Sequence, residues 1–150
     1  MAVVRGTDGV IEVSDDGGTT YALVASQQTW SIDQSNDTID TTVLGAQRFR
    51  SNLTTFFSWS ATVDGFWDTE DQAAAQGQGI INAAAISGDK IHIKITPNVA
   101  DSSGVPKTGD MQYEGECTVT SNNPSGGFDT AVQLSMAFEG TGELTYAAMV

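Results

Sequence analysis

Hydrophobic and polar residues alternate along much of this chain, which is the pattern of strands with one buried face. The alternation is strongest over residues 57–67, where large apolar residues take one parity and Ser, Thr and Asp take the other. The same pattern recurs at residues 9–13, 22–32, 91–95, 113–119 and 132–139. We expect the apolar parity to face a core: Val24, Trp30, Ile32, Phe57, Trp59, Ala61, Val63, Trp67, Ile91, Ile93, Ile95, Tyr113, Cys117, Val119, Val132, Leu134, Met136 and Phe138.

The period changes between residues 69 and 87, which predicts one helix there. Thr69 and Gln72 have the spacing of a capping box, and Gly88 is a natural helix stop. The residues expected on the buried side of this helix are Ala73, Gly77, Ile80 or Ile81, and Ala84. Gly- and Pro-rich stretches predict a hairpin turn at residues 15–20, a long loop at 96–110 and a sharp turn at 122–127.

Composition agrees with a β protein. The 150 residues suit a single domain spanning residues 1–150, with one compact core. Charged residues make up only 17% of the chain, and glycine and small polar residues are abundant. These features predict an all-β class with one helix.

The balance of charge restricts the partners. Nineteen acidic residues against six basic ones give a formal net charge of −13, which repels phosphate backbones. The single cysteine, Cys117, excludes an intrachain disulfide. The first 13 residues lack the apolar core of a secretion signal, and no segment has the about 20 apolar residues of a membrane span. We therefore expect no specific DNA binding and no membrane insertion.

Candidate chemistry is sparse. His92 lies among alternating isoleucines and has no triad partners, so a packed or solvated role is favoured over a general base. Asp15 with Asp16, and Glu114 with Glu116, lack the oxygen-rich loop spacing of a calcium site. The QGQG segment lacks the lysine of a phosphate loop. We expect no enzyme activity, no metal and no cofactor.

Three tryptophans, Trp30, Trp59 and Trp67, offer an alternative. Exposed on one sheet, they would make the sugar-stacking platform of a monomeric carbohydrate-binding module. Trp59 and Trp67 share the parity of Phe57 and Val63, which favours packing in the core instead.

Four segments, in order, resemble the major tail tube proteins of long-tailed bacteriophages. They are DTTVLG at residues 40–45, WSATVDGFWD at 59–68 leading into the helix, GECTVTSNNPSGG at 115–127, and VQLSMAFEGTGELTY at 132–146. A basic patch, QRFR, lies at residues 47–50 between the first two. The resemblance rests on the joint order of these segments and covers most of the chain.

The resemblance implies a mostly β fold, a β-sandwich or barrel of two packed antiparallel sheets with one flanking helix. It also implies six copies per ring and rings stacked into a tube, an acidic conduit through which DNA passes without specific binding. Implied partners are the tape-measure protein, the baseplate or tail-tip proteins and the tail terminator. The protein would be made in the host bacterial cytoplasm and reside in the phage tail of the virion.

Two groups of residues follow as expectations from the resemblance. The segment at residues 39–55 matches a loop that reaches the adjacent ring, with contact candidates Asp40, Thr41, Thr42, Arg48, Phe49, Arg50 and Asn52. Polar strand faces provide candidates for the lumen lining, namely Glu114, Glu116, Gln133 and Glu139. A type VI secretion tube protein, with the same architecture, remains an alternative; the threonine-rich segment and the junction before the helix favour the phage protein.

Overall fold

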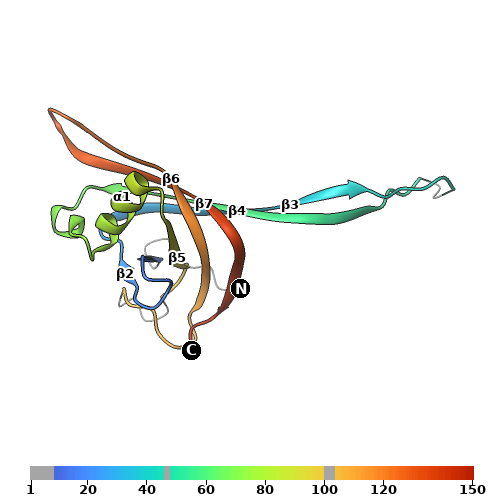
Figure 1. The fold of residues 1–150 in the computed structure, drawn as a ribbon, viewed down its shortest axis with the longest axis horizontal. Coiled ribbons are helices and arrows are strands. Elements are labelled where there is room, and N and C mark those ends of the chain that lie inside the picture. Colours follow the sequence, from blue (N-terminus) through green and yellow to red (C-terminus); the bar gives the residue numbers. More distant parts are fainter. Residues whose placement is uncertain (1–8, 46–47, 100–103) are drawn as a thin grey trace.

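A computed structural model of the chain describes residues 9–45, 48–99 and 104–150 (Figure 1). Its elements are β1 (Val10–Ser14), β2 (Ala22–Leu23), β3 (Gln27–Asp40), β4 (Asn52–Phe66), a 3-10 turn η2 (Thr69–Gln72), α1 (Gly77–Ser87), β5 (Lys90–Thr96), β6 (Met111–Gly127) and β7 (Thr130–Ala148). The mostly β fold with one α-helix is confirmed for the described residues. The start of the chain before Gly9, Gln47 of the basic patch and residues 100–103 of the predicted long loop lie outside them.

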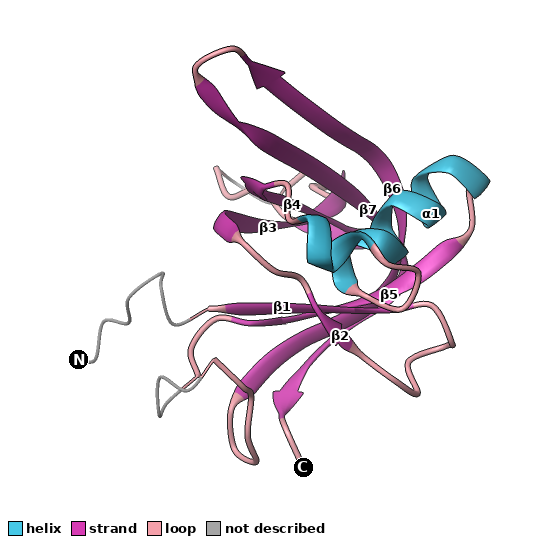
Figure 2. Ribbon diagram, turned by 90° about the vertical axis from the view of Figure 1, so that its left-hand side faces the viewer, coloured by secondary structure: helices cyan, strands magenta, loops and turns pink. Residues whose placement is uncertain are grey.

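The strands form one antiparallel sheet in the order β2-β1-β5-β6-β7-β4-β3. The sheet curls, so that β1, β2 and β5 lie opposite β3 and β4, with the long strands β6 and β7 joining the two layers (Figure 2). β6 pairs with β5 near its beginning, and β7 pairs with β4 near its own. The two layers expected of a sandwich are therefore halves of one continuous sheet.

The core lies between these layers and has the predicted parity. Ile91, Ile93 and Ile95 of β5 are buried against alternate residues of β4, β6 and β7, and α1 covers the open side with Ile80, Ile81 and Ala84. Alternating residues remain buried because only one face of each strand is covered by the opposite layer.

Phe57, Trp67 and Val132 were expected in this core, and that expectation is wrong. Val132 is 43% exposed and precedes Gln133, the first residue of β7 that pairs with β4. Phe57 is 43% exposed and Trp67 is 36% exposed. β7 pairs with β4 only over residues 60–66, so Phe57 lies beyond the covered part of the strand. Trp67 follows the last residue of β4. Matching parity does not bury a residue that lies outside the overlap of the layers.

The helix is shorter than predicted. Residues 69–72 form the 3-10 turn η2, and α1 begins only at Gly77. The carboxylate of Asp68, rather than the predicted Thr69, caps η2 by accepting a hydrogen bond from the amide of Glu70 at 3.0 Å. A Cβ on Gly77 would collide with the backbone of Leu23, so glycine permits this close approach at the helix start.

The predicted stop at Gly88 is confirmed. Gly88 adopts the left-handed conformation with φ of 79°, and its amide donates to the carbonyl of Ala84.

The predicted turn at residues 122–127 is wrong, because β6 continues to Gly127. The turn consists of Phe128 and Asp129, and Gly127 pairs with Thr130. β5 pairs with β6 only as far as Thr118, so residues 119–127 form an edge of the sheet. An edge strand tolerates a proline such as Pro124, which donates no backbone hydrogen bond.

A buried polar cluster joins the helix to both layers. The side-chain nitrogen of Gln78 donates to the backbone carbonyls of Ala25 and Phe66, both at 2.9 Å. The side-chain oxygen of Gln78 accepts from the backbone amide of Asp68 at 3.1 Å. The carboxylate of Asp71 accepts from the backbone amides of Ala25 and Gln78. These bonds fix the junction between the end of β4 and the start of α1.

Replacing Gln78 by leucine removes the side-chain partners of the partly buried carbonyls of Ala25 and Phe66 and of the backbone amide of Asp68. We expect the free energy of unfolding of the monomer to fall by about 3 kcal/mol, because each unsatisfied buried group costs about 1–3 kcal/mol. Urea unfolding measures this change. Gln76→Leu is the matched control, since Gln76 is exposed and its side chain makes no cap hydrogen bond, so it should change stability by less than about 0.5 kcal/mol. Equal effects of the two substitutions would contradict this role for Gln78.

Candidate assembly surfaces

The face of β3, β4 and β7 that points away from the core is polar. Asp33 of β3 pairs with Ser60 of β4, which pairs with Glu139 of β7. Hydroxyl groups bond across the strands, Ser35 to Ser58 at 2.8 Å and Ser31 to Thr62 at 2.5 Å. A shallow, open concavity of about 480 Å³ lies on this face. This face is exposed to solvent in the single chain, and we call it the polar face.

All four lumen candidates lie on the face of the sheet opposite the core, but they are not equally free. Gln133 and Glu139 are exposed. Glu114 is half-buried and accepts a hydrogen bond from the Tyr21 hydroxyl at 2.7 Å. Burial, followed by this bond, raises the pKa of Tyr21. The loop between β1 and β2 therefore covers part of this face.

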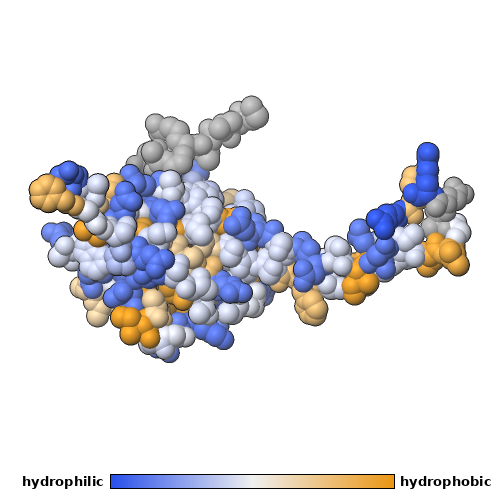
Figure 3. Space-filling view, turned by 90° about the horizontal axis from the view of Figure 1, so that it is seen from above, coloured by the Kyte–Doolittle hydropathy of each residue, from blue (hydrophilic) through white to orange (hydrophobic). Residues whose placement is uncertain are grey.

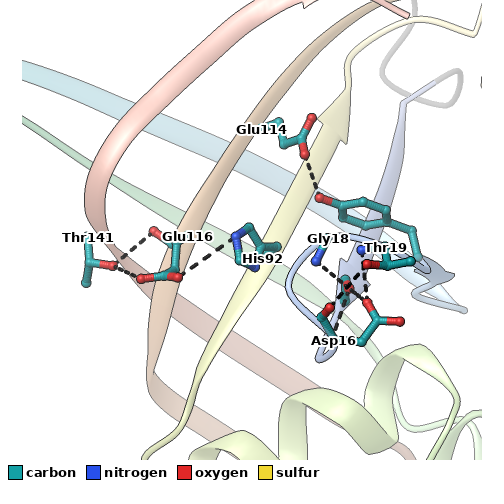
Figure 4. A network of polar contacts seen from close by, with 9 residues as sticks. Asp16, Gly18, Thr19, His92, Glu114, Glu116 and Thr141 are labelled. Carbon is teal, nitrogen blue, oxygen red and sulfur yellow. Dashed lines mark hydrogen bonds and ion pairs between the residues drawn. The ribbon is translucent and has the colours of Figure 1, made fainter. Parts of the chain in front are cut away.

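Glu116 is half-buried as well and belongs to a second small group of contacts (Figure 4). It accepts from the Thr141 hydroxyl at 3.1 Å, and its other oxygen lies 3.9 Å from Nε2 of His92. These contacts give His92 and both glutamates structural partners. The described residues contain no group of three or more His, Cys, Asp or Glu side chains able to hold a metal ion.

Asp16 also has a structural role, in the turn after β1. Its carboxylate accepts from the Ser14 hydroxyl at 2.6 Å and from the amides of Thr20 and Thr19 at 2.9 and 3.0 Å (Figure 4). The Ser14 bond, followed by the backbone bond from Thr20, lowers the pKa of Asp16 to about 2. The carboxylate stabilises the predicted turn.

The tryptophans do not form a platform. Trp59 is only 3% exposed and belongs to the core, Trp30 is half-buried against it, and Trp67 lies at the far end of β4. The indole of Trp59 lies against Gly115 of β6 and Gly140 of β7, where a Cβ on either glycine would collide with it. One buried and one half-buried tryptophan cannot stack on a sugar at the surface.

The sheet has two long free edges. Among the described residues, β3 is the last strand of the sheet and pairs only with β4 along its 14 residues. β6 is unpaired on its other side over residues 119–127, beyond the end of β5. Unpaired edges of this length are templates for pairing with another chain.

β3 and β4 continue well past the body of the protein as a two-stranded arm, which we define as residues 36–57 (Figure 1). The predicted loop at 39–55 is partly strand, because Ile39 pairs with Leu53 and Asp40 with Asn52. The connecting segment is residues 41–51. All the predicted contact candidates lie at the outer end of this arm.

Polar contacts order the end of the arm. The backbone amide of Thr41 donates to the carbonyl of Ser51, and the hydroxyl of Thr42 accepts from the Ser51 amide, both at 2.9 Å. Arg50 lies 3.4 Å from Asp40, but both side chains are largely exposed, at 85% and 55%, so this ion pair contributes little. Hydrogen bonds from the side chain and the amide of Thr42 lower the pKa of Asp40.

The arm also exposes apolar side chains. Arg48 lies over the ring of Phe49 at 5.7 Å. Figure 3 shows hydrophobic residues along the arm and at its end. The exposed large apolar residues are Ile39, Val43, Leu44, Phe49, Leu53, Phe56 and Phe57. So many apolar residues on a projection without a core indicate a surface that is covered by another chain.

Comparison with known proteins identifies the family. The family model described as "Phage tail tube protein" matches residues 3–146. No curated protein sequence matches. Among the described residues, no helix is long and apolar enough to cross a membrane.

Several solved structures share the fold. A chain from the tail of an empty GTA particle, refined with C6 symmetry, has a TM-score of 0.77 at 19% identity, with 97% of this chain and 100% of that chain covered. The SPP1 tail tube has a TM-score of 0.75 at 16% identity, with coverage of 99% and 81%. A chain of the sheath–tube complex of an extracellular contractile injection system, PVC, has a TM-score of 0.66 at 14% identity, with coverage of 98% and 93%. The family match over nearly the whole length shows that this chain belongs to the phage tail tube protein family.

Proposed function

We propose that this tail tube protein assembles into hexameric rings that stack into a tube, and that the tube is an acidic conduit for the phage genome. The observation that carries this proposal is the pair of free edges on one layer of the sheet. These are β3 on one side and residues 119–127 of β6 on the other.

Strand directions favour pairing between those edges. β6, β7, β4 and β3 are neighbours and successive pairs are antiparallel, so β3 and β6 run in opposite directions. β3 of one copy can therefore continue the antiparallel sheet into β6 of the next copy. Because two different edges meet, the contact is head-to-tail, and it generates a ring when the rotation closes. A closed barrel leaves no free edge in this layer.

The number six comes from the C6 symmetry of the similar tail of the GTA particle. The layer of β1, β2 and β5, together with α1, covers the core side of the layer that contains β3 and β4. We call the first of these the second layer. In a closed ring the second layer and α1 lie on the outside, because on the inside they would fill the channel. The polar face then lines the lumen.

The lining would be acidic and hydroxyl-rich. Glu139, Gln133 and Asp33 are its exposed members here. Glu114 and Glu116 pair with Lys94 and His92 of β5, so they belong to the layer that would lie outside and would contribute little to the lining. Six copies with a formal charge of −13 each would repel the phosphate backbone from the wall. DNA would then pass without specific binding.

Reversing two charges on the lining tests this role. In particles carrying Asp33→Lys with Glu139→Lys, we expect tubes of normal length but DNA release slowed several-fold, since phosphates now attract the wall. Potassium efflux from infected cells or DNA release from purified particles measures the rate, and higher salt should reduce the delay. The control is Asp15→Lys with Asp89→Lys, which changes the charge by the same amount. Asp15 follows β1 and Asp89 follows α1, so both lie away from the polar face. If the first variant released DNA at the wild-type rate, this result would contradict the assignment of the polar face to the lumen.

The remaining parts of the proposal follow from the family and its relatives. Structures of a baseplate, a tube terminator and a terminating cap contain chains of this fold, which supports a baseplate or tail-tip protein and a tail terminator as partners. A tape-measure protein would occupy the lumen during assembly. Synthesis would occur in the host bacterial cytoplasm, with the tail of the virion as the final location. A structural protein of this kind needs no catalytic residue and no cofactor.

Negative-stain imaging of the concentrated protein tests the proposed function. We expect hollow tubes, or rings with six-fold symmetry, alone or after addition of the tail-tip complex. A protein that stays monomeric under both conditions would contradict the proposal. Retention on a polysaccharide column by such a monomer would instead support the carbohydrate-binding alternative.

A further inference from the structure

The sheet carries two projections at opposite ends. At one end the arm extends beyond the last residues of β4 that pair with β7. At the other end the β6–β7 hairpin extends beyond the final pair between Phe66 and Gln133. Figure 1 shows the arm on the right and the hairpin at the upper left. In a ring closed through β3 and β6, the strand direction places these projections on opposite rims.

The hairpin end carries exposed apolar residues that the fold does not use. Phe128 forms the turn and is fully exposed, and Val132 and Trp67 are partly exposed. The amide of Trp67 donates to the carbonyl of Val132 at 2.8 Å, which places these two residues side by side. We define Trp67, Phe128 and Val132, with Asp68 and Asp129, as the hairpin-end patch.

The two ends differ in charge as well as in position. Arg48 and Arg50 at the end of the arm are two of only six basic residues in an acidic chain. Asp68 and Asp129 flank the apolar residues of the hairpin-end patch, and no basic residue lies within residues 64–76 or 121–132. Asp40 lies beside Arg50, so residues 40–52 at the end of the arm carry one acidic and two basic residues, a formal charge of +1. Apolar groups with a weakly basic flank therefore face apolar groups with an acidic flank when one ring stacks on another.

We infer that the hairpin-end patch is the docking site for the arm of a second copy of this chain in the neighbouring ring. This inference rests on the proposed function, because it needs stacked rings. Leu44 and Phe49 supply the apolar contact from the arm, against Phe128 and Val132. A head-to-tail contact that does not close on itself repeats without limit and produces a filament.

Crosslinking tests the contact directly. The variant Leu44→Cys with Phe128→Cys places one thiol on each projection, and the native Cys117 is fully buried, with its pKa raised to about 12 by burial. After assembly and treatment with a short bis-maleimide, we expect a ladder of covalent multimers on a denaturing gel, whereas either single variant gives dimers at most. Normal tubes without a ladder would overturn the inference and leave the proposed function intact. Absence of tubes from the wild-type protein would overturn both.

A second variant measures the contribution of the patch. Phe128→Ser should shorten tubes at least about tenfold, with rings persisting, because the apolar contact between rings is lost. Ile86→Ser is the matched control, since Ile86 is a large exposed apolar residue on α1, and its tubes should keep their length. Melting of the Phe128→Ser monomer at the wild-type temperature shows that the fold is intact. Full-length tubes from Phe128→Ser would overturn the inference.

Discussion

Replacing Gly140 by alanine should destabilise the monomer by about 3 kcal/mol. A Cβ at this position would overlap the indole of Trp59, which is almost fully buried and lies across β6 and β7. Overpacking of a core in this way costs typically about 1–3 kcal/mol, and the large indole has little room to move. Urea unfolding monitored by tryptophan fluorescence measures the change.

Gly126→Ala is the control for this substitution. A Cβ on Gly126 would meet only Val132, whose side-chain Cγ2 would be the nearest atom at 3.3 Å, on the exposed hairpin. We expect a change of less than about 0.5 kcal/mol. The double variant Gly140→Ala with Trp59→Phe should be less unstable than the sum of the two single effects, because the smaller ring relieves the collision. Additive losses would contradict the proposed contact.

Removing the arm should abolish long tubes without unfolding the protein. Replacement of residues 37–56 by Asn-Gly joins Asn36 to Phe57, which already pair, through a two-residue turn that suits a hairpin. The described side chains of the deleted segment are exposed, so none of them makes a core contact. Tube length, measured by electron microscopy, should fall by more than about tenfold if each lost apolar contact removes about 1.5–3 kcal/mol of stacking energy.

The melting temperature of the monomer is the control for this deletion. It should stay near the wild-type value, because the overlap of β4 with β7 over residues 60–66 is intact. Full-length tubes from the shortened protein would show that rings stack without the arm.

The core was predictable from sequence because burial on one face imposes a period of two. Ile91, Ile93 and Ile95 illustrate this, as do Leu134, Met136 and Phe138. The arm was harder to predict as strand, because both of its faces are exposed in the single chain and neither selects for alternation. The polar composition of the arm is typical of a loop, and only the pairing of β3 with β4 shows that it is strand.

Other differences have equally local causes. Proline and glycines at residues 122–127 predicted a turn, but an edge strand accommodates them. The lumen candidates lie on the face of the sheet opposite the core, yet the Glu114 carboxylate accepts a hydrogen bond from Tyr21, which is 93 residues away in the chain. No pattern near Glu114 indicates that contact. The order of the family segments located the arm, whereas Phe128 belongs to none of the predicted contacts.

Hydrogen exchange of backbone amides, measured on monomers and on assembled tubes, tests the pairing of the two free edges most directly. In the monomer, about half the amides of β3 and of residues 119–127 should exchange rapidly, because in an antiparallel edge strand alternate amides face the open side. In tubes, these same amides should become protected, while the buried amides of β5 stay unchanged. Tubes in which β3 and residues 119–127 exchange as fast as in the monomer would contradict closure of the ring through these edges.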